Sequence, residues 1–208
     1  MIKAVSFDIG NTIYLASQNQ TVLNELSQIL NLPLEQVKRT FRQIFNKNDG
    51  DLRELTEKFC KELKSNKFNE ILFFFENLSK KSEKNQYVDK NIIKLIKKLK
   101  KSGIKVVLSS SSNILKNYQL DEEILKHVDH VFRTYEVGYL KDEENYYRFI
   151  ENKLNLKSEE ILNVGNSLKY DYEMPKKFGW NAILFNCPEK GCKTVEELSK
   201  EIEKFLSI

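Results

Sequence analysis

Short apolar runs alternate with amphipathic stretches along most of this chain. The amphipathic stretches place apolar residues three and four positions apart, as at Ile92, Leu95, Ile96 and Leu99, which is typical of helices that bury one face. The apolar runs end at turn or polar residues, which is typical of buried strands, and they lie at 4–7, 104–108, 131–132, 161–164 and 182–185. Strands that alternate with helices predict a doubly wound parallel sheet in an α/β fold.

Residues from about 18 to 85 have a different pattern, with helical spacing of apolar residues throughout. Asn-Leu-Pro at 31–33 and Asn-Asp-Gly-Asp at 48–51 interrupt this spacing, so four helices with short links are expected. A polar segment at 80–86 then predicts a linker. We therefore expect an α/β core formed by residues 1–16 and 86–208, with a small, all-helical subdomain inserted at 17–85.

The composition excludes several classes of protein. Lys and Arg number 34 against 30 Asp and Glu, giving a net charge of +4, and the basic residues are mostly Lys mixed with Glu. That mixture is typical of a solvated surface, so no nucleic-acid partner is expected. The longest apolar run, at 71–75, is far shorter than the roughly 18–20 residues that span a bilayer. Asp8 interrupts the first apolar stretch, which argues against a signal peptide. We expect a cytoplasmic protein with no membrane partner.

Cysteine usage agrees with that expectation. The chain has 3 cysteines, and an odd number argues against a secreted disulfide scaffold. Cys187 and Cys192 lie close together in a Pro/Gly loop, where either a local disulfide or two free thiols are compatible with the sequence.

Polar residues capable of chemistry follow four of the predicted strands. Asp8 ends the first strand, a run of serines at 109–112 ends the second, Lys141 follows the third, and Asn166 and Asp171 follow the fourth. In doubly wound sheets, ligands bind outside the carboxyl ends of the strands, so we expect these groups to converge. A carboxylate can act as a nucleophile, a Lys can neutralise developing charge, and oxygen ligands suit a hard cation.

These motifs, in this order, resemble the haloacid dehalogenase (HAD) superfamily over nearly the whole chain. The first motif matches Phe7-Asp8-Ile9-Gly10-Asn11-Thr12, and the second is best matched by Ser110, with Ser109 next. The third motif matches Lys141, and the fourth matches Gly165-Asn166 with Asp171. The helical insert is similar to the cap of the phosphoglucomutase and dehalogenase branch of this superfamily.

The resemblance implies a Rossmann-like HAD core and a phosphatase that hydrolyses a small phosphorylated metabolite. It implies that Asp8 is the nucleophile and forms an aspartyl-phosphate, while Ser110 and Lys141 hold the phosphate. It also implies Mg²⁺ as the cofactor, bound by Asp8, the Gly10 carbonyl, Asn166 and Asp171. The remaining substrate contacts would come from three neighbouring residues: Asn11, Thr12 and Ser111.

Two departures from the family pattern keep other functions open. Gly10 stands where the family usually has a second Asp, the general acid and base, and such a group is worth about 10²–10⁴-fold in rate. Gly10 therefore favours substrates with good leaving groups, such as anomeric or aryl phosphates, or an acid supplied by the helical insert. Asn166 replaces an Asp, so the metal would be held by fewer negative charges. The alternatives are a metal-independent 2-haloacid dehalogenase and a catalytically degraded relative that binds a ligand or a partner protein.

Overall fold

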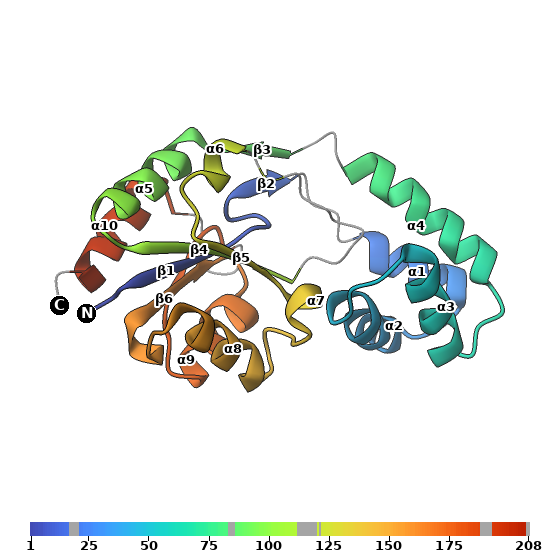
Figure 1. Ribbon diagram of the computed structural model, residues 1–208. Coiled ribbons are helices and arrows are strands. Elements are labelled where there is room, and N and C mark those ends of the chain that lie inside the picture. The colour runs from blue at the N-terminus through green and yellow to red at the C-terminus, as the bar shows by residue number, and fades with distance from the viewer. Residues whose placement is uncertain (17–20, 83–85, 112–119, 121, 188–192, 207–208) are drawn as a thin grey trace.

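The computed structural model describes residues 1–16, 21–82, 86–111, 120, 122–187 and 193–206. Its centre is a parallel five-stranded sheet with the strand order β5-β4-β1-β6-β7 (Figure 1). The strands are β1 (Ala4–Asp8), β4 (Lys105–Ser110), β5 (His130–Arg133), β6 (Ile161–Gly165) and β7 (Asn181–Leu184). In chain order, β4 and β5 extend the sheet on one side of β1, and β6 and β7 then extend it on the other side. The predicted doubly wound α/β fold is therefore confirmed, and the reversal of strand order lies at β1.

Helices cover both faces of this sheet (Figure 1). One face packs against α5 (Lys90–Lys101), α6 (Glu122–Leu125) and α10 (Val195–Leu206), and the other against α8 (Glu144–Leu154). Successive side chains of β1 point to opposite faces: Val5 and Phe7 lie in the first core, whereas Ala4 lies in the second. Every residue of β1 is buried, as expected for the central strand of a parallel sheet.

Shorter helical elements complete the sheet domain. The remaining elements are α7 (Thr134–Val137), η3 (Ser158–Glu160), η4 (Leu168–Glu173) and α9 (Met174–Lys177). The π-helix η4 follows β6 after Asn166 and Ser167, and the Ser167 hydroxyl accepts a hydrogen bond from the Tyr170 N–H at 3.2 Å. A helix that begins this soon after a strand keeps its first residues close to the strand end.

The segment between β2 and β3 forms a group of helices, here called the helical bundle, to one side of the sheet (Figure 1). Its elements are α1 (Thr21–Leu30), α2 (Leu34–Phe41), the π-helix η1 (Arg42–Asn46), α3 (Leu52–Glu62) and α4 (Phe68–Ser82). Four phenylalanines meet at its centre, with ring centroids 4.8–6.2 Å apart: Phe41, Phe45, Phe59 and Phe75. The predicted domain boundaries, at 17 and 85, fall outside the described residues.

The sequence prediction misses a small sheet at the base of the bundle. β2 (Tyr14–Ala16) pairs antiparallel with β3 (Gln86–Val88), so the linker predicted for 80–86 is wrong in part: α4 runs to Ser82 and residue 86 begins a strand. Each strand has three residues, which is too short to produce a recognisable alternation of apolar and polar positions. β2 precedes the bundle in the chain and β3 follows it, so their pairing holds together the two segments that connect the bundle to the sheet domain.

Candidate functional site

Three charged side chains meet at the carboxyl end of β1. Asp8 is the last residue of β1, Lys141 follows α7, and Asp171 lies in η4 after β6. The Lys141 Nζ lies 2.6 Å from Asp8 Oδ1 and 2.9 Å from Asp171 Oδ1, and all three residues are buried. Residues that are 133 and 30 positions apart in sequence are thus joined by hydrogen bonds within one site.

Asp171 is held by hydrogen bonds from β6 and from the residue that precedes η4. Its Oδ2 accepts a hydrogen bond from the Ser167 N–H at 3.0 Å, and its carbonyl accepts one from Asn163 Nδ2 at 2.8 Å. A Cβ added to Gly165 would lie 2.5 Å from Asp171 Cγ. Gly165 is therefore required for space, because the Asp171 side chain passes directly over its Cα.

Lys141 is held by a closed turn. The Glu143 N–H donates to the Leu140 carbonyl at 2.9 Å, and the Leu140 N–H donates to Glu143 Oε2 at 3.2 Å. The Tyr147 hydroxyl donates to the Lys141 carbonyl at 2.7 Å. The Tyr147 ring in turn packs edge-on against Trp180, with centroids 5.1 Å apart. Nothing in the sequence pattern of α8 singles out Tyr147, because a buried Tyr in an amphipathic helix is usually a packing residue.

The site carries an excess of negative charge, since two buried carboxylates face one ammonium group. Burial alone would lower the pKa of Lys141, but Asp171 and Asp8 outweigh it and hold that pKa well above its usual value. Lys141 is therefore positively charged. Burial raises the pKa of Asp8 to about 7, with Asp171 adding to the increase and Lys141 opposing it. Burial, rather than repulsion from Asp171, is therefore the main reason that Asp8 holds its proton to a higher pH than usual.

The loop after Asp8 turns back on itself. Gly10 forms an isolated bridge with Tyr14, and the Asn11 N–H donates to the Tyr14 carbonyl at 2.8 Å. Asn11 has a φ of 56°, a left-handed conformation that Asn adopts more readily than most residues. The Thr12 hydroxyl is buried and has no hydrogen-bond partner among the described residues. These contacts fix the shape of the loop next to Asp8.

The serines at the end of β4 lie beside this loop. Ser109 pairs with Asp8 in the register of β4 and β1, and its carbonyl accepts a hydrogen bond from the Ile9 N–H at 3.2 Å. Ser110 follows at the last position of β4, where it pairs with Arg133 of β5 and is buried. Ser111 is the last described residue before a gap. The assignment of the phosphate-holding hydroxyl to Ser110, rather than to Ser109, stays a prediction.

The donor atoms at this strand end fit a hard cation such as Mg²⁺. Asp8 and Asp171 supply carboxylate oxygens, and Gly10 and Asn166 could add a carbonyl and an amide oxygen, which are the ligand types that Mg²⁺ takes. Two carboxylates that face one ammonium group leave one negative charge in excess when both are ionised, which also suits a cation. Within the described ranges, no group of three or more His, Cys, Asp or Glu residues could hold a metal ion. A cation here therefore depends on neutral oxygens as well.

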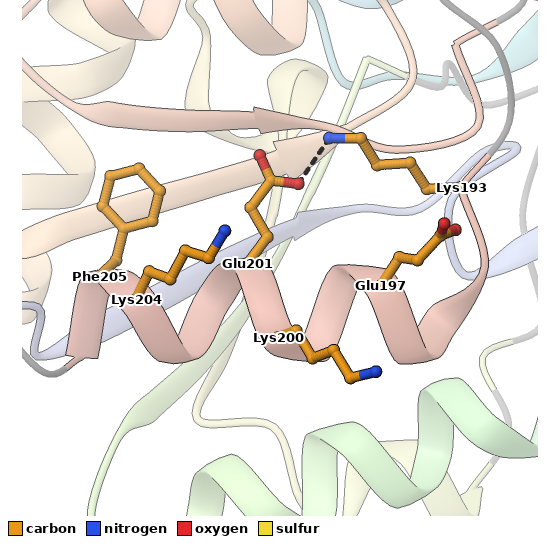
Figure 2. Close-up of a pocket in the computed structure, with 6 residues that line it drawn as sticks. All are labelled: Lys193, Glu197, Lys200, Glu201, Lys204 and Phe205. Atoms are coloured by element: carbon orange, nitrogen blue, oxygen red, sulfur yellow. Dashed lines mark hydrogen bonds and ion pairs between the residues drawn. The ribbon is translucent and has the colours of Figure 1, made fainter.

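A surface pocket lies elsewhere, along α10 (Figure 2). It is lined by Lys193, Glu197, Lys200, Glu201, Lys204 and Phe205. Lys193 and Glu201 form an ion pair across it at 2.5 Å, as the dashed line in Figure 2 shows. No residue of the site at Asp8 contributes to this pocket.

Among the described helices, none has the length and apolar character needed to cross a membrane.

Comparison with known proteins agrees with this geometry. A sequence model of the haloacid dehalogenase-like hydrolases matches residues 2–179. The chain belongs to this family. The match includes Asp8, Lys141 and Asp171, so the three residues that meet in space lie within the region that defines the family. None of the curated proteins matches the chain in sequence.

Solved structures of the HAD family share the fold. A HAD phosphatase from Thermococcus onnurineus is 22% identical, with a TM-score of 0.58, over 97% of this chain and 98% of that one. A HAD family enzyme from Bacteroides thetaiotaomicron, in complex with magnesium and inorganic phosphate, is 12% identical, with a TM-score of 0.58, over 90% and 96% of the chains. The L-2-haloacid dehalogenase RSc1362 is 12% identical, with a TM-score of 0.59, over 97% and 99%. These HAD neighbours include both phosphatases and dehalogenases, so they show the fold and leave the reaction open.

Proposed function

We propose that this HAD family hydrolase is a Mg²⁺-dependent phosphatase that acts on a small phosphorylated metabolite in the cytoplasm. The observation that carries the proposal is the Lys141 ammonium group, which lies between the Asp8 and Asp171 carboxylates at 2.6 and 2.9 Å. A nucleophilic carboxylate beside a cationic group and a second carboxylate suits phosphoryl transfer, which depends mainly on positioning and charge neutralisation.

In the proposed reaction, an Asp8 carboxylate oxygen attacks the phosphorus, and the bond from phosphorus to the substrate oxygen breaks. Lys141 pairs with the phosphoryl oxygens and neutralises their charge, and Ser110 donates a hydrogen bond to them. Water then attacks the phosphorus of the aspartyl-phosphate, the bond to Asp8 breaks, and inorganic phosphate leaves. Asp8 and Asp171, with the Gly10 carbonyl and Asn166, would hold Mg²⁺, which supplies further neutralisation of phosphoryl charge.

The chemistry of the leaving group follows from Gly10, which has no side chain to act as an acid. The departing oxygen would then take its proton from solvent or from an acid of the bundle, or leave as an anion. We therefore propose substrates whose leaving group is a stable anion, such as anomeric or aryl phosphates. A substrate that needs protonation by the enzyme would lose the roughly 10²–10⁴-fold that a general acid supplies.

The test is hydrolysis of p-nitrophenyl phosphate with and without Mg²⁺, by the wild-type protein and by Asp8→Asn. The nitrophenolate leaving group needs little protonation, so the absence of an acid at Gly10 hardly matters. We expect turnover by the wild-type protein that requires Mg²⁺ and that Asp8→Asn abolishes. The matched control is Asp49→Asn, since Asp49 is an exposed loop residue whose carboxylate accepts a hydrogen bond from the Gly50 N–H.

Two results would contradict the proposal. Activity retained by Asp8→Asn would exclude Asp8 as the nucleophile. Absence of turnover by a folded wild-type protein would favour the dehalogenase or the ligand-binding alternative. Release of chloride from a 2-haloacid without added metal would then identify a dehalogenase, and absence of both reactions would favour the binding protein.

A further inference from the structure

Two acidic residues directly after Lys141 bind the helical bundle. Arg42 Nη2 of η1 lies 2.8 Å from Asp142 Oδ1, and the Lys47 Nζ lies 2.6 Å from Glu143 Oε1. These side chains are 26–31% exposed, so both pairs are partly buried. The turn that presents Lys141 to the site is therefore also a contact surface between the sheet domain and the bundle. Figure 1 shows α7, which precedes this turn, beside the bundle.

Arg42 makes a second contact, with the residue that precedes Asp171. Its guanidinium carbon lies 5.0 Å from the centre of the Tyr170 ring, within the range of a cation–π interaction. Asp142 follows Lys141 directly, and Tyr170 precedes Asp171 directly. Arg42 thus binds the immediate neighbours of the two residues that form the Lys141–Asp171 ion pair.

These contacts form a closed ring. It runs from Arg42 to Asp142, along the backbone to Lys141, across the ion pair to Asp171, along the backbone to Tyr170, and back to Arg42. Lys47 supports the same turn, because the carboxylate that it binds also accepts the Leu140 N–H that closes the turn. Displacement of the bundle would therefore remove support from both Lys141 and Asp171.

We infer that Arg42 is a positioning residue that couples the bundle to the site, by holding the segments that carry Lys141 and Asp171. This inference deepens the proposed function, because it predicts that the resting position of the bundle affects the phosphate-binding geometry. Arg suits the role better than Lys, since a planar guanidinium group can bind a carboxylate and stack on an aromatic ring together. We call Arg42 a positioning residue because its ion pair and its ring contact are with Asp142 and Tyr170, and not with Asp8.

The first experiment measures the position of the bundle and needs no turnover. Fluorescent labels at Phe73→Cys on α4 and Lys153→Cys on α8, both exposed positions, report the distance between bundle and sheet by energy transfer. The labels go into a Cys192→Ser background, where the two remaining cysteines, Cys60 and Cys187, are buried.

Arg42→Asp places a carboxylate opposite Asp142, and we expect the labels to move apart. The double variant Arg42→Asp with Asp142→Arg restores an opposite-charge pair and should restore the shorter distance. A surface ion pair changes an equilibrium by up to about fivefold, and Arg42→Asp replaces attraction to Asp142 with repulsion. We therefore expect the ratio of molecules with the shorter distance to molecules with the longer distance to fall by about tenfold. The matched control is Arg39→Asp, an exposed position on α2, which should leave the distance unchanged.

A second measurement covers the case in which Arg42→Asp does not fold. Arg42→Ala removes the ion pair with Asp142 and the contact with Tyr170 without placing a second carboxylate beside Asp142, so it should also lengthen the mean distance. An unchanged distance in whichever of the two variants folds would overturn the inference. These outcomes are independent of the reaction, so a failure of the phosphatase proposal would not be mistaken for a failure of this one.

Kinetics then separate positioning from simple stability. If Arg42 positions Lys141 and Asp171, kcat for p-nitrophenyl phosphate falls more than KM rises, in the order wild type, Arg42→Lys, Arg42→Ala. Arg42→Lys keeps the charge opposite Asp142 but loses the planar stack on Tyr170, so it should rescue activity in part. Equal kcat values for folded Arg42→Ala and wild type would contradict the positioning role.

Discussion

Gly165→Ala provides the sharpest test of how the site is built. The added methyl group would lie 2.5 Å from Asp171 Cγ and 2.6 Å from both Asp171 Cβ and Oδ2. Such contacts are far inside van der Waals separation, so the Asp171 side chain must move. Because Asp171 Cβ is one of the close atoms, a rotation of the carboxylate alone cannot relieve the overlap, and the backbone of η4 must shift as well.

The cost can be estimated from the interactions that this movement breaks. Asp171 would lose its contact with Lys141 at 2.9 Å and the Ser167 N–H at 3.0 Å, and hydrogen bonds to charged groups are worth about 1.5–3 kcal/mol each. Overpacking adds about 1–3 kcal/mol. Since part of this energy is recovered by relaxation, we expect a net loss of about 3 kcal/mol in the free energy of unfolding. Under the proposed function, displacement of Asp171 should also reduce Mg²⁺-dependent turnover by at least about 100-fold.

Thermal unfolding and p-nitrophenyl phosphate hydrolysis measure the two effects. Gly103→Ala is a suitable control, because Gly103 also resists substitution, with a φ of 77°, yet no atom lies within 4 Å of its added Cβ. It should lose about 1 kcal/mol of stability and keep its activity. A Gly165→Ala protein with wild-type stability and activity would refute the argument that the Asp171 side chain occupies the space over Gly165.

Two further predictions concern the residues around Lys141. Burial raises the pKa of Asp8 from 3.8 to about 7, so its contribution to stability is greatest below about pH 4 and is lost as the pH rises through 7. Without metal, Asp8→Asn should therefore be more stable than wild type by more than about 1 kcal/mol at pH 8, with no gain at pH 4, in urea unfolding at both pH values. Tyr147→Phe leaves the Lys141 carbonyl without its donor at 2.7 Å and should cost about 1–2 kcal/mol. Calorimetry of Tyr147→Phe beside wild type measures this loss.

The sequence predicts the sheet well because its strands are short apolar runs that end at turn residues. Asp8, Lys141 and Asp171 are each placed near a strand end by that pattern, and the parallel topology brings them together. The sequence pattern does not predict that these three side chains touch. Their contact depends on Gly165 having no side chain and on the turn closed by Glu143, and neither feature produces a periodic pattern of apolar residues.

The contacts between bundle and sheet domain are the least predictable part. Arg42 and Lys47 follow the polar pattern of an ordinary solvated helix face, so their pairing with Asp142 and Glu143, about 100 residues away, has no local signature.

The phenylalanine cluster of the bundle has a consequence for how the protein opens. Among the described residues, the buried core of the bundle shares no member with the two cores that flank the sheet. Independent cores allow independent cooperative units, which exchange their amide hydrogens at different rates. The bundle can therefore lose its structure transiently while the sheet keeps Asp8 in place. Substitutions around Phe45 would then change how often the contacts of Arg42 and Lys47 with the turn after Lys141 are lost, without changing the strands of the sheet.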